Sequence, residues 1–272
     1  MYINARHTHT SMDTLPYLSE YILCVAAIFL LYQLVAYLPY GKFSIPDAPY
    51  SQYHMIHPGV AFSIPFIVGL LLLAIGWFED GMFHVDKPPR SPKGWVTLMI
   101  LLAYFGWRVV AQMIVYNVID PPNGKKRTSI FFVAVQFVYY PAVAMNFRRM
   151  CYYITDPIEP SEAAFAVVVI LSLIANGCVD ILLNVWRKDT SITVDLGYHG
   201  RYLESHELSK RFAILSMCGM DPNYVFEIIA WVFFTAFTKR WESFWWLVAT
   251  LMILIPRMMW NMHWYALDPS KE

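Results

Sequence analysis

The chain has 272 residues, of which 58% are hydrophobic, 17% are aromatic and only 15% are charged. Soluble globular proteins contain about 45–50% apolar and about 25% charged residues, so this composition indicates an integral membrane protein. The formal net charge is zero, which argues against a basic surface, and we expect no nucleic-acid partner. The four cysteines are scattered without ligand spacing, and the sequence predicts no metal site.

Seven apolar segments follow one another, separated by Pro, Gly and charged residues. Each is close to the roughly 20 residues that a helix needs to cross a bilayer. We therefore expect an all-α integral membrane protein with about seven transmembrane helices. It should form a single membrane domain over 1–272, with N-terminal helices in 17–119 and a C-terminal half in 129–272. The segments are Leu18–Leu38, Pro58–Phe78, Gly94–Ile119, Ser129–Phe147, Ser161–Trp186, Asn223–Thr238 and Trp241–Trp260. The proline-rich run Pro88–Lys93 is expected to be a non-helical loop.

The segment Pro222–Trp231 places a carboxylate inside an apolar helix. Asn223 and Glu227 are four residues apart and share a helical face. An acid on a membrane helix is costly, so it is a functional-site hypothesis by default. The alternative is that Glu227 pairs with a neighbouring side chain and only holds helices together. Arg108 in the third segment and Arg257 in the seventh are the natural counter-charges.

A second polar face lies on the fifth segment and its exit. Asn176, Asp180 and Arg187 have offsets of four and seven, which place them on one side of a helix. An amide, a carboxylate that accepts from sugar hydroxyls and a guanidinium that binds phosphate together suit a nucleotide. The alternative is an ion pair between Asp180 and Arg187 or Lys188, with a structural asparagine.

These two motifs together resemble the membrane-embedded steroid 5α-reductase superfamily, which includes steroid 4-ene reductases, very-long-chain enoyl-CoA reductases and polyprenol reductase. The family stretch Asn-x-x-x-Asp-x-x-Leu-x-x-x-Arg-Lys corresponds to 176–188, and Pro-Asn-Tyr-x-x-Glu-x-x-x-Trp corresponds to 222–231. The seventh segment ends in a similar Arg and Tyr. The resemblance implies a seven-helix bundle that acts as an NADPH-dependent oxidoreductase on CH–CH groups. It implies cofactor contacts for Asn176, Asp180, Arg187, Asn223, Glu227, Arg257 and Tyr265, converging between the fifth, sixth and seventh segments.

The N-terminal half departs from this family at the residues that polarise the substrate. Ser63 stands where the family has a glutamate that contacts the substrate carbonyl, and serine does not replace a protonated carboxylic acid as a donor. The catalytic tyrosine of the family corresponds to Tyr104, but Arg108 is one residue out of register. Asp189–Gly219 replaces the Gly-rich loop between the two motifs. We therefore expect NADPH binding to be weak or vestigial.

Two functions follow from these observations. The first is a divergent, catalytically impaired reductase-like protein that serves as an accessory or structural subunit of a larger membrane complex, for example of respiratory-chain type. Its partners would be membrane lipids and other subunits, and its place the mitochondrial inner membrane. The alternative is an NADPH-dependent reductase of an α,β-unsaturated lipid carbonyl (steroid 4-ene, polyprenal or enoyl-CoA) in the endoplasmic reticulum, with Tyr104 as the proton donor. The lost glutamate and Gly-rich loop favour the first function. Lys and Arg are nearly balanced between the two sides, so the positive-inside rule assigns no orientation.

Overall fold

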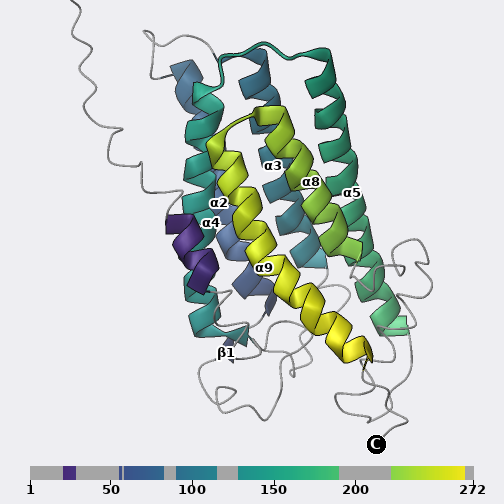
Figure 1. The fold of residues 1–272 in the computed structure, drawn as a ribbon. Helices are drawn as coiled ribbons and strands as arrows, with labels where there is room; N and C mark the ends of the chain where they lie inside the picture. The colour runs from purple at the N-terminus through teal and green to yellow at the C-terminus, as the bar shows by residue number, and fades with distance from the viewer. Residues whose placement is uncertain are drawn as a thin grey trace, which may run out of the picture.

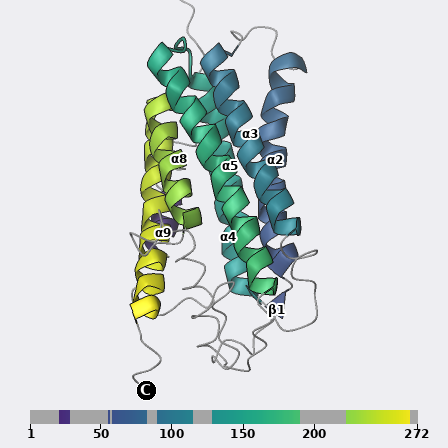
Figure 2. The ribbon, with the colours of Figure 1, turned by 90° about the vertical axis from the view of Figure 1, so that its right-hand side faces the viewer.

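The computed structural model describes residues 21–28, 55–56, 58–82, 90–114, 128–189 and 222–266, and the account below is confined to them. Long helices run side by side in one bundle (Figures 1 and 2). The elements are β1 (Met55–Ile56), α2 (Pro58–Met82), α3 (Pro92–Met113), β2 (Thr128–Ser129), α4 (Ile130–Tyr153), α5 (Pro160–Asp189), α8 (Pro222–Thr238) and α9 (Trp241–Ala266). Residues 21–28 are also helical. The described part of the chain is thus helical except for one antiparallel pair of two-residue strands.

The described helices occupy the second to seventh predicted segments. Several boundaries differ from the prediction. Helix α2 extends to Met82 and α4 to Tyr153, beyond the predicted ends at Phe78 and Phe147, and α3 begins at Pro92 rather than Gly94. Ser91 caps this helix, with its hydroxyl accepting a hydrogen bond from the Gly94 N–H at 3.0 Å. Proline fits the first helical turn because its missing N–H would have no partner there. The expectation that all of Pro88–Lys93 is non-helical is therefore wrong for Pro92 and Lys93.

Three of the described helical stretches are long and apolar enough to cross a membrane: Pro92–Met113, Pro160–Leu182 and Trp241–Met259. The outer face of α5 carries large apolar side chains, including Val167, Leu171 and Ile174. Their spacing of four and three residues places them on one side of the helix. An apolar outer face of this kind suits lipid, and these stretches indicate a membrane protein.

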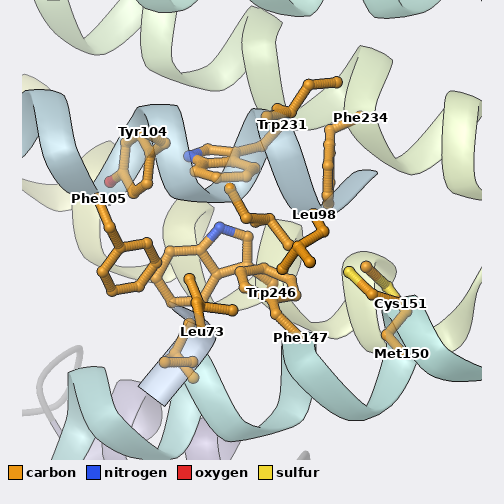
Figure 3. Close-up of a cluster of buried hydrophobic side chains, with 14 of the residues drawn as sticks. Leu73, Leu98, Tyr104, Phe105, Phe147, Met150, Cys151, Trp231, Phe234 and Trp246 are labelled. Atoms are coloured by element: carbon orange, nitrogen blue, oxygen red, sulfur yellow. The ribbon is translucent and has the colours of Figure 1, made fainter. Parts of the chain in front are cut away.

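Aromatic rings fill the centre of the bundle between α3, α4, α8 and α9 (Figure 3). Trp231 lies perpendicular to Trp246, with ring centroids 5.5 Å apart, and perpendicular to Tyr104 at 4.9 Å. The indole nitrogen of Trp246 points towards the Trp231 ring, and that of Trp231 points towards Tyr104 (Figure 3). N–H groups directed at aromatic faces form weak hydrogen bonds. This arrangement gives a physical reason why both buried indole nitrogens have no conventional partner among the described residues.

A glycine allows α3 and α5 to lie close together. A Cβ atom at Gly177 would overlap the indole of Trp107. Gly177 follows Asn176 and precedes Asp180 by three residues, so the same contact brings the helix that carries them against α3. Only glycine leaves room for this approach.

Candidate functional site

A cluster of polar side chains lies between α3, α5 and α8, and its centre is the guanidinium of Arg108. One terminal nitrogen of Arg108 donates to both carboxylate oxygens of Glu227, at 2.8 Å each. The other terminal nitrogen lies 3.4 Å from Asp180 Oδ2. One cation on α3 therefore connects two carboxylates on two other helices. We call this group of residues, with the side chains described next, the polar cluster.

Two asparagines connect α5 to the first turn of α8. Asn223 Nδ2 donates to Asp180 Oδ1 at 2.9 Å. Asn176 Nδ2 donates to the backbone oxygen of Asn223 at 2.6 Å. Asn176 and Asp180 reach the same partner because four residues separate them on α5. The carboxylate of Asp180 is thus held by Arg108 on one side and by an amide on the other.

Tyr104 completes the polar cluster one turn before Arg108. Its hydroxyl donates to Glu227 Oε1 at 3.2 Å and accepts from the Nε of Arg108 at 3.4 Å. The side chain is buried, with 4% of its surface exposed. The single proton of this hydroxyl is therefore directed at a carboxylate of the protein itself.

The charged members of the polar cluster are largely shielded from solvent. The side chains of Arg108, Glu227 and Asp180 are 14%, 10% and 23% exposed. Withdrawing charges from water is costly, and only close pairing with further hydrogen bonds offsets that cost. The geometry supplies both, because each carboxylate has one cationic partner and at least one neutral donor.

The structure brings together four of the seven residues to which the family resemblance assigns cofactor contacts: Asn176, Asp180, Asn223 and Glu227. The third wall of their cluster is α3, which supplies Tyr104 and Arg108, whereas the sequence placed it on the seventh segment. The correction has two physical reasons. Glycine at position 177 lets α3 approach α5 closely, and Arg108 of α3 is the cation that pairs with Glu227 and Asp180. Arg257 lies on α9 and is half-buried. Arg187 and Tyr265 lie on the helical backbone of α5 and α9, and their side chains are outside the described part.

Ser63 lies on α2 and is also outside the polar cluster. It is 4% exposed, and its hydroxyl has no hydrogen-bond partner within the described structure. The position that departs from the family is thus a buried hydroxyl.

Sequence reasoning missed a second group of charges, at the end of the bundle where α3 and α5 begin. Lys93 Nζ donates to Glu162 Oε1 at 2.8 Å, and the two side chains are 1% and 2% exposed. Lys239, just after α8, lies 3.0 Å from the same oxygen. Its backbone has a φ of 52°, the left-handed conformation that often ends a helix. Hydrogen bonding to Glu162, and then to Glu159, raises the pKa of Lys239. The sequence does contain a signal for this group: the acid Glu162 and the two lysines Lys93 and Lys239 all lie at segment ends on the same side of the predicted bundle.

Among the residues whose placement is described, no three His, Cys, Asp or Glu side chains are grouped so that they could hold a metal ion. A comparison with models of protein families finds no match to the chain. A comparison with curated proteins also finds no similar sequence. The resemblance to the steroid 5α-reductase superfamily therefore rests on the two motifs quoted above.

Proposed function

We propose that this chain is a divergent, catalytically impaired reductase-like protein that serves as an accessory subunit of a larger membrane complex. The observation that carries the proposal is that the side chains of the polar cluster hydrogen-bond to one another, with the Oδ1 atom of Asn223 left without a partner in the described structure. The residues that would contact NADPH in a reductase instead bond to one another and to Arg108. In this proposal they act as a joint between three helices of a seven-helix, reductase-like bundle.

The energy of buried charges supports a structural role for this joint. A bound dinucleotide would compete for the amide and guanidinium groups that now hold Asp180 and Glu227. Leaving a buried carboxylate without its cation typically costs about 3–5 kcal/mol. Ser63 in place of the expected glutamate removes a donor for a substrate carbonyl as well. Any binding of NADPH is therefore expected to be weak or vestigial.

An exposed aromatic group at the start of α9 supports contact with another subunit. Trp241 is 71% exposed and stacks on Trp245, with ring centroids 6.1 Å apart. Tryptophan is enriched at the centres of protein interfaces and at membrane–water boundaries. Membrane lipids and neighbouring subunits are the partners that such a group suits. The mitochondrial inner membrane is the proposed location.

The test is gentle solubilisation of the membrane followed by native electrophoresis of the tagged, full-length chain. We expect it to migrate in a species much larger than its own 31.6 kDa plus detergent. Trp241→Ala should release part of the chain from that species. Met259→Ala, which alters a 63%-exposed residue towards the other end of α9, should not. A stable lone monomer in the unaltered protein would overturn the proposal.

The second candidate is an NADPH-dependent reductase of an α,β-unsaturated lipid carbonyl in the endoplasmic reticulum. The observation in its favour is that Arg108 Nε approaches the Tyr104 hydroxyl, at 3.4 Å. A buried phenol that such a contact holds in place is positioned to donate to a developing enolate. NADPH would supply a hydride to the β-carbon of the substrate.

Activity measurements distinguish the two candidates. We expect no enzyme-like oxidation of NADPH by the purified chain with an enone or an enoyl thioester. Loss of one preorganised donor typically lowers the rate by about 10²–10³. Robust turnover that Tyr104→Phe abolishes would favour the reductase over the accessory subunit.

A further inference from the structure

A second set of buried polar side chains lies near the polar cluster, among α2, α3 and α4. Its members are Ser63, Gln112, Gln136 and Tyr139, which we call the neutral group. Ser63, Gln136 and Tyr139 are 4%, 7% and 4% exposed. In the described structure, both hydroxyl oxygens and the Oε1 atoms of both glutamines have no hydrogen-bond partner. Buried polar groups are nearly always paired, so four neighbouring exceptions require an explanation.

The starts of α2 and α4 fix two members at the same height in the bundle. The strand pair β1–β2 places Met55 opposite Ser129, immediately before the two helices begin. The helices then run in the same direction, as the ribbon shows (Figure 1). Ser63 is in the second turn of α2, and Gln136 is in the second turn of α4.

The same two residues face the seam between their helices. The rings of Phe66 and Tyr140 meet across this seam, with centroids 4.1 Å apart. Ser63 is three residues before Phe66, and Gln136 is four residues before Tyr140. Residues three or four apart on a helix share a face, so both polar side chains lie one turn below the ring contact.

Gln112 reaches the same level from α3. The guanidinium of Arg108 lies 6.0 Å from the centre of the Phe66 ring, so α3 also joins this seam. Because α3 runs opposite to α2, Gln112, one turn after Arg108, lies on the same side of the ring contact as Ser63 (Figure 1). Tyr139, three residues after Gln136, lies on the same side of α4, with its ring against Tyr140 and Trp246.

The chemistry of the neutral group selects the class of its ligand. Two amides and two hydroxyls offer both donors and acceptors and carry no charge. Arg108, the cation one turn before Gln112, is already bound to Glu227 and Asp180. A charged ligand would therefore lose its hydration without gaining a counter-charge. An uncharged group that both donates and accepts hydrogen bonds fits these partners.

The surroundings indicate that such a ligand also has an apolar part. Met113 follows Gln112 directly and is 44% exposed, and Phe137 follows Gln136 and is 38% exposed. Each amide is thus next to an apolar side chain on the surface of the bundle. We propose that the neutral group binds the uncharged, hydroxyl- or amide-bearing head group of a membrane lipid, of the diacylglycerol or ceramide class. This goes beyond the proposed function and holds for an accessory subunit or for a reductase.

The experiment measures lipid binding to the full-length chain, purified in the assembly in which mild detergent extracts it. The probes are a fluorescent short-chain diacylglycerol and a ceramide, compared with a triacylglycerol and a phosphatidic acid of equal chain length. The triacylglycerol lacks the hydroxyl, and the phosphatidic acid adds charge. We expect saturable binding of the first two lipids, with at least tenfold weaker binding of the other two.

Variants identify the site. Gln112→Leu and Gln136→Leu should each weaken diacylglycerol binding by about two- to tenfold, the typical effect of one lost hydrogen bond. Both remove an amide oxygen that has no partner in the described structure, so folding should be preserved. Thr97→Val on α3 is the matched control, because it removes a buried hydroxyl about 22 Å from Gln112 along the helix. Equal binding of all four lipids, or wild-type affinity in both glutamine variants, would overturn the proposal. Absence of saturable binding, which leaves ordered water as the occupant, would overturn it as well.

Discussion

Arg108→Met tests whether the polar cluster holds the bundle together. The substitution keeps most of the side-chain volume and removes four interactions, two with Glu227 at 2.8 Å and one each with Asp180 and the Tyr104 hydroxyl at 3.4 Å. Two carboxylates that are 10% and 23% exposed would then lack their cation. Breaking a buried pair on one side typically costs about 3–5 kcal/mol. We expect the free energy of unfolding to fall by that amount.

The assay is reversible unfolding in mixed detergent micelles, followed by circular dichroism. Adding Glu227→Gln to the Arg108→Met variant should restore part of the loss, because it removes one of the unpaired charges. The coupling between the two sites should be about 0.5–3 kcal/mol, the usual range for residues in contact. Arg240→Met is the control, since its pair with Asp156 is 31% and 58% exposed and should contribute about 0–1 kcal/mol. A cost below about 1 kcal/mol for Arg108→Met, or additive losses, would refute the structural joint.

Three further predictions concern the packing and the second charged group. Gly177→Ala should destabilise the bundle by about 1–3 kcal/mol, because its methyl group would overlap Trp107, whereas Gly106→Ala meets no atom within 4 Å and should be neutral or slightly stabilising in the same assay. Lys93→Met should lower the free energy of unfolding by about 3–5 kcal/mol if Lys239 does not compensate. A loss in the Lys93→Met, Lys239→Met double variant that is larger than the sum of the two single losses would show that both lysines share Glu162. The raised pKa of Lys239 means that its contribution is present at neutral pH and lost as the pH rises through the raised value, above the ordinary lysine pKa of about 10.4. Melting temperatures of wild type and Lys239→Met should therefore differ by a constant amount up to the ordinary lysine pKa and converge as the pH rises through the raised pKa. Convergence near neutral pH would contradict the ion pair between Lys239 and Glu162.

Much of the fold was predictable because hydrophobicity alone separates the helices. Apolar runs between Pro, Gly and charged residues located the helices from α2 to α9, and the turn at Lys239 and Arg240 separates α8 from α9. The start of α3 lies two residues before the predicted one, because Ser91 and Pro92 form a helix start although proline breaks helix interiors. The first predicted segment lies outside the described residues except for 21–28. The number of membrane crossings stays a prediction, with three stretches that meet the requirement of length and hydropathy.

The polar cluster was predictable in its members but not in its partners. Helical spacing aligned Asn176 with Asp180 and Asn223 with Glu227, since four residues return to the same face. Which helix faces them depends on contacts between segments far apart in the sequence, and spacing within one segment does not contain that information. Arg108 was identified as a counter-charge by the cost of a buried charge. The ion pair of Lys93 with Glu162 was missed because both residues lie at segment ends, where charges are usually solvated.

The two charged groups act at different heights on the same helices. Arg108, in the last third of α3, connects this helix to α5 and α8, while Lys93 connects the start of α3 to the start of α5, and Lys239 adds the end of α8. Two cross-links at separate heights oppose rotation of these three helices as well as sliding. Catalytic reorganisation around a cofactor would have to break the connection made by Arg108, while the connection made by Lys93 and Lys239 holds the helix ends in place. A rigid set of three helices is therefore expected on this side of the bundle, while the neutral group lies among α2, α3 and α4. The lipid-binding measurements change Gln112 and Gln136 and leave the side chains of the polar cluster unaltered.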